Sequence, residues 1–168
     1  MITIRCIISG GQTGADRGAM LAAHDLGLVR GGMAPAGWRA EDGEIPPWFR
    51  AGMMQSASSA YPVRTRSNVE ASDGTLIVSF GPLTAESGSM LTSKLARAAG
   101  KPLLAIQLAD TGYRSELMVA RVRNWLHRQK IVTLNVAGPR ESREPGIQAA
   151  TRAALNAILA DEIGFGGR

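Results

Sequence analysis

Apolar residues along the chain gather into short runs that are separated by segments with helical spacing. Four runs rich in Ile, Leu and Val are typical of buried parallel strands, at 2–8, 75–80, 102–108 and 130–136. A fifth, weaker run predicts a strand at 27–33. Each run is short enough to be one strand of a sheet and far too short to cross a bilayer.

Between these runs the apolar positions recur at the period of an α-helix. The predicted helices are 15–26, 89–99, 115–128 and 145–163. Strands that alternate with helices indicate an α/β fold, in which a mainly parallel sheet has helices on both faces. Ligands of such sheets bind beyond the carboxyl ends of the strands, so residues there are the candidates for function.

The segment 31–69 shows no clear period and contains four prolines. A connection of this length is usually functional, so we expect an ordered but irregular flap over the site. The rest of the chain indicates a single domain over 1–163, followed by a frayed tail at 164–168.

The charge of the chain favours an anionic small-molecule ligand. The net charge of +5 comes from sixteen arginines and only three lysines, spread along the chain without a basic run. Arginine is the better bidentate partner for phosphate and other oxyanions. A single cysteine excludes an internal disulfide and any multi-cysteine metal site. With no candidate membrane span or signal segment, we expect a cytoplasmic protein.

The stretch S-G-G-Q-T-G-A-D-R at 9–17 follows the first predicted strand. Its three glycines allow a tight turn and positive φ angles, and Thr13 with Asp16 has the spacing of a capping box. The pattern predicts a helix that begins after Thr13, with the amides of 13–16 open to bind phosphate. Asp16 would repel an anion, so we interpret it as structural or as a partner of Arg17.

Two other strand ends carry polar residues. In 80–89, Ser87 or Ser89 would cap the next helix, which is either an ordinary cap or a second place with free amides. In 134–142, Asn135 lies at the end of the last strand and Arg140 offers a bidentate oxyanion clamp.

Taken together, five ordered motifs resemble the putative molybdenum carrier family. They are I-S-G-G-Q-T-G-A-D-R at 8–17, G-G-M-A-P-A-G-W-R-A-E-D-G at 31–43, Y-P-V-R-T-R-S-N-V at 61–69, S-D-G-T-L-I-V at 72–78 and L-N-V-A-G-P-R-E-S at 134–142. That family lies within a Rossmann-like nucleotide-binding class with the cytokinin-activating phosphoribohydrolases and DNA-processing protein A. The resemblance implies a Rossmann-like three-layer sandwich, binding of molybdenum cofactor or another phosphorylated heterocycle or nucleotide, and homo-oligomers.

The resemblance and the strand-end residues together give one candidate binding site. Its residues are Gly10, Gly11, Gln12, Thr13, Gly14, Arg39, Glu41, Asp42, Arg64, Thr65, Asn68, Ser87, Gly88, Ser89, Asn135, Gly138 and Arg140. One departure from the family pattern is that Met33 and Ala34 replace the usual bulky residue and cysteine before Pro35.

Three functions remain open from the sequence, with no catalytic or metal-ligating residue assigned. A binding or carrier protein agrees best with the residues. A nucleotide-processing N-glycosidic hydrolase is the first alternative, with Glu41 as its acid or base, because Glu86 stands before the helix start rather than inside it. A binder of single-stranded nucleic acid is ranked last, since the few aromatic residues lie mostly in apolar contexts.

Overall fold

The computed structural model describes residues 4–85, 87–108 and 115–160. At its centre a six-stranded sheet has the order β5-β2-β1-β8-β6-β7, and every pairing in it is parallel. These strands are β1 (Cys6–Ile8), β2 (Val29–Ala34), β5 (Met53–Gln55), β6 (Gly74–Ser79), β7 (Leu103–Gln107) and β8 (Thr133–Ala137). A separate antiparallel ribbon pairs β3 (Arg39–Ala40) with β4 (Gly43–Glu44).

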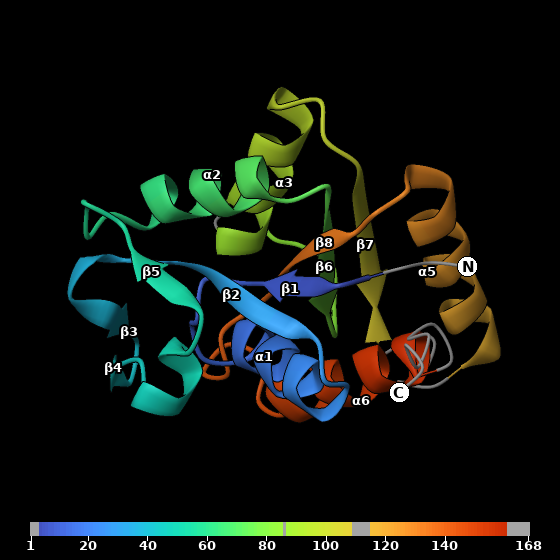
Figure 1. Ribbon diagram of the computed structural model, residues 1–168, viewed down its shortest axis with the longest axis horizontal. Helices are drawn as coiled ribbons and strands as arrows, with labels where there is room; N and C mark the ends of the chain where they lie inside the picture. Colours follow the sequence, from blue (N-terminus) through green and yellow to red (C-terminus); the bar gives the residue numbers. More distant parts are fainter. Residues whose placement is uncertain (1–3, 86, 109–114, 161–168) are drawn as a thin grey trace, which may run out of the picture.

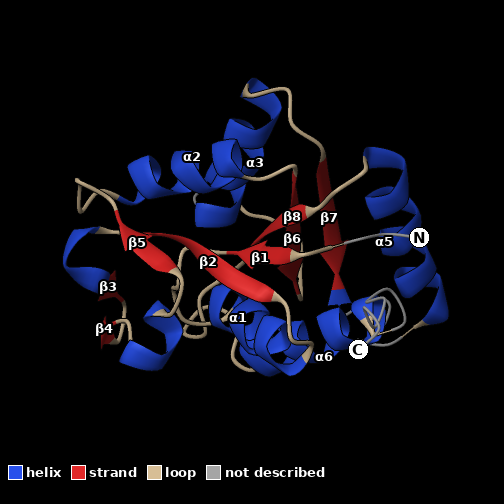
Figure 2. Ribbon diagram, viewed as in Figure 1, coloured by secondary structure: helices blue, strands red, loops and turns tan. Residues whose placement is uncertain are grey.

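Helices cover both faces of the sheet, so the fold is a Rossmann-like α/β three-layer sandwich (Figure 1). On one face lie α2 (Tyr61–Ala71) and α3 (Gly88–Ala98). On the other lie α1 (Ala15–Asp25), α5 (Glu116–Gln129) and α6 (Ile147–Leu159). Two short 3₁₀ helices, η1 (Ala36–Trp38) and η2 (Pro47–Arg50), flank the β3–β4 ribbon (Figure 2). Within the described part of the chain, no helix has both the length and the apolar character that a bilayer span requires.

The two faces of the sheet differ in polarity. Against α1, α5 and α6 the interior is apolar, with fully buried side chains such as Leu76, Leu134 and Leu155. On the other face, Thr75 and Asn135 are buried polar residues of the sheet, and Asn135 Nδ2 donates a hydrogen bond to Thr75 Oγ1 at 3.2 Å. Polar groups inside a fold must be hydrogen-bonded, and this pair satisfies that requirement between neighbouring strands.

The predicted strands and helices are confirmed to within a few residues at their ends, apart from the parts that lie outside the described residues. The expectation that 31–69 is irregular is wrong, because β5 and η2 lie inside it and α2 begins at Tyr61. The sequence of helix α2 shows no apolar stripe, because two of the three buried residues of this helix are polar, Thr65 and Asn68. The predicted tail at 164–168 lies outside the described residues.

The strand order brings three distant connections to one edge of the sheet. Strand β8 lies between β1 and β6 and is parallel to both. The segments that leave these strands therefore begin at the same edge: 9–14 after β1, 80–87 after β6 and 138–146 after β8. Ligands of parallel α/β sheets bind beyond the carboxyl ends of the strands, so a binding site is expected at this edge.

Candidate functional site

The first of these connections, between β1 and α1, is closed by the protein's own groups. The Gln12 amide donates to Asp16 Oδ2 at 3.3 Å, and the Thr13 amide donates to the Gln12 side-chain oxygen at 3.0 Å. The Ala15 amide donates to the Pro139 carbonyl at 3.2 Å. The prediction of an open anion site from these amides is therefore wrong for Thr13 and Ala15, whose N–H groups are already satisfied.

The predicted capping box between Thr13 and Asp16 is also wrong. Helix α1 begins at Ala15 after Gly14, and no side chain caps it. The Thr13 hydroxyl instead donates to the Glu41 carboxylate and accepts from the Glu141 amide at 3.3 Å. Thr13 thus joins the β1–α1 loop to two other segments rather than closing its own helix.

The glycines of this loop make room for protein atoms. A Cβ on Gly10 would lie 1.3 Å from Arg64 Nη1, and one on Gly14 would lie 2.3 Å from the Pro139 carbonyl oxygen. Gly14 also has a φ of 79°, which side chains rarely adopt. The close approach that these glycines permit is to α2 and to the loop after β8.

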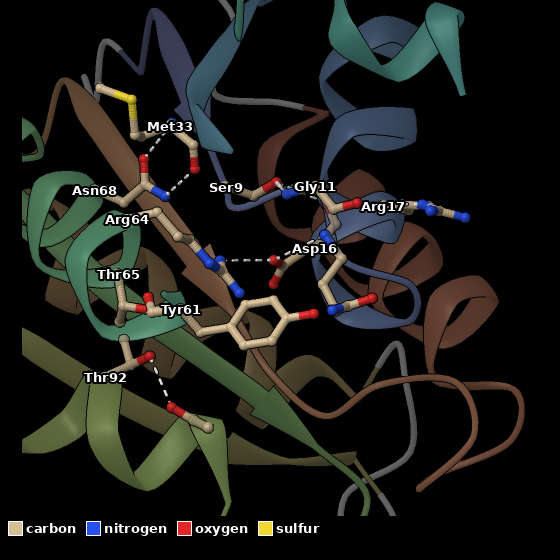
Figure 3. A network of polar contacts seen from close by, with 12 residues as sticks. Ser9, Gly11, Asp16, Arg17, Met33, Tyr61, Arg64, Thr65, Asn68 and Thr92 are labelled. Carbon is tan, nitrogen blue, oxygen red and sulfur yellow. Dashed lines mark hydrogen bonds and ion pairs between the residues drawn. The ribbon is translucent and has the colours of Figure 1, made fainter. Parts of the chain in front are cut away.

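Asp16 forms a buried ion pair with Arg64, not with Arg17. Arg64 Nη1 lies 3.4 Å from Asp16 Oδ2, and both side chains are largely buried. Figure 3 shows Arg64 reaching from α2 to Asp16 at the start of α1, with the Tyr61 ring beside the pair. Burial raises the pKa of Asp16, and the charge of Arg64 opposes that rise. Arg17 pairs with Asp42 instead.

Next to this ion pair lies a cavity of about 560 Å³. Its walls come from four places: the start of α1, the start of α2, the β6–α3 connection with the first turns of α3, and the loop after β8. A volume of this size is typical of sites for small molecules and cofactors. The cavity therefore lies at the sheet edge that the strand order predicts.

Three residues of the cavity wall each hold a buried polar atom that has no hydrogen-bond partner among the described residues. These atoms are Gln12 Nε2, Arg64 Nε and Ser89 Oγ. The residues Gln12 and Ser89 are 5% and 2% exposed. A buried donor without a partner costs about 1–3 kcal/mol, and all three of these groups can donate. The cavity is thus suited to a ligand that is rich in acceptor oxygens.

The N-terminus of α3 opens into the same cavity. Ser87 is the N-cap, and its hydroxyl accepts from the Met90 amide at 3.1 Å, as the sequence predicts. The first amides of a helix have no partner within it and carry the positive end of its dipole. Gly88 and Ser89, which lie in this first turn, line the cavity. Both helix starts in the prediction contribute to the wall, but the amides of Thr13 and Ala15 at the start of α1 are already bonded to protein groups.

The charged groups of the wall are mixed. Arg64, Arg140 and Arg143 line the cavity together with Asp16 and Glu144. The Glu144 carboxylate is engaged, because it accepts from the Phe80 amide at 2.6 Å. Both carboxylates therefore serve hydrogen bonds of the protein, which leaves an excess of cationic and N–H donors toward the cavity.

Comparison with known proteins identifies the family. The model of the circularly permutated YpsA SLOG family matches residues 7–159. The chain belongs to this family. A crystal structure of a putative molybdenum carrier protein from Syntrophus aciditrophicus is also similar, with 39% identity and a TM-score of 0.88 over 94% of this chain and 96% of that chain. No curated protein matches.

In this member of the circularly permutated YpsA SLOG family, the cavity gathers only some of the residues that the sequence predicted. Those that line it are Gln12, Arg64, Thr65, Ser87, Gly88, Ser89, Gly138 and Arg140. Those that do not line it are Gly10, Gly11, Thr13, Gly14, Arg39, Glu41, Asp42, Asn68 and Asn135. From the segment 31–69, only residues of α2 reach the wall.

Several residues of the second group have structural partners. The Glu41 carboxylate accepts from the hydroxyls of Thr13 and Ser142, the latter at 2.5 Å. Asn68 holds Met33 by two hydrogen bonds, from the Met33 amide at 2.7 Å and to its carbonyl at 3.0 Å. The β3–β4 ribbon and β2 are thereby fixed to the site without entering the cavity.

Several residues of the cavity wall were not predicted from the sequence. Tyr61, Thr92 and Glu144 line the cavity, and the first of them is overlooked because α2 was not recognised. The spacing of Tyr61, Arg64 and Thr65 is the i, i+3, i+4 pattern of one helix face, and this was the available signal. Among the described residues, no group of three or more His, Cys, Asp or Glu side chains could hold a metal ion.

Proposed function

We propose that this protein binds and carries an anionic phosphorylated heterocycle, with molybdenum cofactor as the leading candidate. The observation that carries the proposal is that three residues lining one cavity each hold a buried, unpartnered polar atom: Gln12 Nε2, Arg64 Nε and Ser89 Oγ. The name of the Syntrophus aciditrophicus neighbour favours molybdenum cofactor over other heterocycles.

In this proposal the phosphate of the ligand lies at the N-terminus of α3. The amides of Gly88 and Ser89 and the Ser89 hydroxyl would surround it, because a helix start stabilises an anion through its free N–H groups and its dipole. Gln12 and Arg64 would donate to acceptor atoms of the heterocycle or of its substituents.

The wall residues fit the chemistry of molybdenum cofactor, a pterin dithiolene with a terminal phosphate and an oxyanionic metal centre. Phosphate and oxo groups are acceptors, and the unpartnered wall groups can donate. Cys6, the only cysteine, does not line the cavity. This chain would therefore hold the cofactor through nitrogen and oxygen atoms of the protein. The metal would keep the dithiolene sulfurs of the cofactor as its ligands.

Recovery of the ligand tests this proposal. Protein expressed in its native host is purified without denaturation, and the small molecule that accompanies it is identified by mass spectrometry. We expect a phosphorylated heterocycle at a stoichiometry near one. Ser89→Ala removes one hydrogen bond to it and should weaken retention by about tenfold. The control Ser93→Ala changes a buried serine of the same helix that does not line the cavity. Equal retention by both variants would contradict the proposal.

The structure offers less support for a hydrolase. Glu41, the candidate acid or base, does not line the cavity and already accepts two hydroxyl hydrogen bonds. Glu86 lies outside the described residues. We therefore propose a binding protein, and a panel of nucleoside monophosphates returned intact after incubation would agree with it. We further propose that the protein is a cytoplasmic homo-oligomer. Size-exclusion chromatography with light scattering would test the oligomeric state.

A further inference from the structure

Three arginines from separate segments surround one aromatic ring at the cavity. The guanidinium carbons of Arg39, Arg64 and Arg140 lie 5.9, 5.7 and 5.1 Å from the centroid of Tyr61. They come from β3, from α2 and from the loop after β8. We call these three residues the arginine cluster. Tyr61, Arg64 and Arg140 also line the cavity, so two members of the cluster lie at its wall, and Arg39 contacts the same ring without lining the cavity.

Two of the three arginines in this cluster have no direct ion pair among the described residues. The third, Arg64, pairs with Asp16. Burial raises the pKa of Glu41, but hydrogen bonds from Ser142 and Thr13 and the nearby charge of Arg140 together lower it. The oxygens of Glu41 are occupied by Thr13 and Ser142. Glu41 therefore offsets part of the charge of Arg140 without forming an ion pair, and the guanidinium N–H groups of Arg39 and Arg140 remain available to a ligand.

Three like charges around a single ring repel one another, since the screening length is about 10 Å at ordinary salt. Cation–π attraction to Tyr61 offsets only part of this repulsion, because such contacts are weak where water reaches them. Arg39 is exposed, and Arg140 is partly so. An anion bound among the three guanidinium groups would relieve the repulsion and accept several charge-assisted hydrogen bonds.

We infer that the ligand carries a second anionic group, separate from its phosphate, and that the arginine cluster binds it beside Tyr61. The inference rests on the proposed function, which assigns the first phosphate to the N-terminus of α3. It narrows the ligand class to heterocycles with two separated anionic groups. The second group is either another phosphate or a metal oxyanion, and both present the same acceptor oxygens to arginine.

Matched nucleotides test this inference by isothermal titration calorimetry. Adenosine 5′-monophosphate has one phosphate, and adenosine 3′,5′-bisphosphate has a second one on the opposite side of the ribose. The wild-type protein should bind the bisphosphate at least tenfold more tightly. A further titration of the monophosphate with and without inorganic molybdate distinguishes a metal oxyanion from a phosphate as the second group.

Variants assign the preference to the cluster. Arg140→Ala should weaken the bisphosphate more than the monophosphate and so remove the tenfold preference. Ser89→Ala should weaken both nucleotides by the same factor, because it acts at the first phosphate. The control Arg66→Ala removes an exposed arginine of the same helix as Arg64, one that does not line the cavity, and should keep the preference.

The outcomes separate this inference from the proposed function. Equal affinity of the wild type for both nucleotides, with no effect of molybdate, would overturn the inference and leave the function standing. If neither nucleotide binds, the proposed ligand class is contradicted. Thermal melting in the presence of inorganic pyrophosphate or molybdate then shows whether the arginine cluster binds an anion. A rise in the melting temperature of the wild type with either anion, which Arg140→Ala abolishes, supports the inference. No rise in the melting temperature overturns it.

Discussion

Arg17 and Asp42 form a two-pronged ion pair that joins α1 to the β3–β4 ribbon. Arg17 Nη1 lies 2.6 Å from Asp42 Oδ2, and Nη2 lies 2.9 Å from Oδ1. The Nε of the same arginine donates to the Gly11 carbonyl at 3.2 Å. One buried side chain therefore links the helix, the β1–α1 loop and the ribbon.

Asp42→Ala should lower the free energy of unfolding by about 1–2 kcal/mol, because it leaves the buried Arg17 without its partner and Asp42 itself is half-exposed to solvent screening. The hydrogen bonds from Arg17 lower the pKa of Asp42. The contribution is therefore fully present above the ordinary aspartate pKa of about 3.9 and is lost as the pH falls. Urea denaturation measures it. The control Glu44→Ala breaks an exposed pair with Arg50 in the same ribbon and should cost at most about 0.5 kcal/mol. Equal losses would contradict the prediction.

Arg64→Gln should destabilise the protein by about 3 kcal/mol at pH 7, since breaking a buried pair leaves the buried Asp16 carboxyl without its cation. Burial raises the pKa of Asp16, so its protonated form is favoured in the fold and stability falls as the pH rises through that pKa. Removing Arg64 raises this pKa further, and the loss should be smaller at pH 5. Chemical denaturation at both pH values measures the free energy of unfolding. The control Arg66→Gln should leave it unchanged. A loss independent of pH would refute this expectation.

Gly10→Ala should abolish ligand retention, because the new methyl group would occupy the position of the Arg64 guanidinium, with 1.3 Å between Cβ and Nη1. The arginine must move, and one of the cavity's unpartnered donors moves with it. Gly81→Ala is the matched control in the β6–α3 connection, since no heavy atom lies within 4 Å of its Cβ position. Affinity is measured by calorimetry and folding by thermal melting. Retention by Gly10→Ala at the wild-type level would show that Arg64 is dispensable.

Asp25 should titrate near pH 2 in the folded protein. Arg152 and Asn156 donate hydrogen bonds to its carboxylate at 2.6, 2.7 and 2.9 Å, and these lower its pKa to about 2. Its contribution to stability is present above the unfolded pKa of about 3.9 and is lost as the pH falls toward 2. Because the pair is exposed, we expect Asp25→Asn to cost less than about 1 kcal/mol above pH 4. Nuclear magnetic resonance of the carboxyl carbon measures the titration, and a midpoint near 3.9 would disagree with the structure.

The sheet was largely predictable because the strands that form its buried centre are continuous apolar runs. The residues of β6 are all buried, so both faces of that strand had to be apolar or internally bonded. Helix α2 was not predictable in the same way, since Thr65 and Asn68 on its buried face satisfy polar partners instead of filling an apolar core. Its pattern resembles that of a loop.

The candidate site was predictable as a place, but not in its detail. The rule for strand ends located the edge at which the cavity lies, and of the two serines predicted as the helix cap, Ser87 is the one that caps α3. The sequence could not show that the Gln12 side chain folds back onto the amides of Thr13 and Glu41. The Gln12 side chain thereby occupies the Thr13 amide at the start of α1, although Gln12 and Asp16 still line the cavity.

The position of β8 has a consequence for how the chain reaches its final form. This strand comes late in the sequence, yet it pairs with both β1 and β6 in the middle of the sheet. During synthesis on the ribosome, the earlier strands can only assemble as two separate halves, each with an open edge that invites aggregation. Ligand capture must then wait until the loop at 138–146 has emerged.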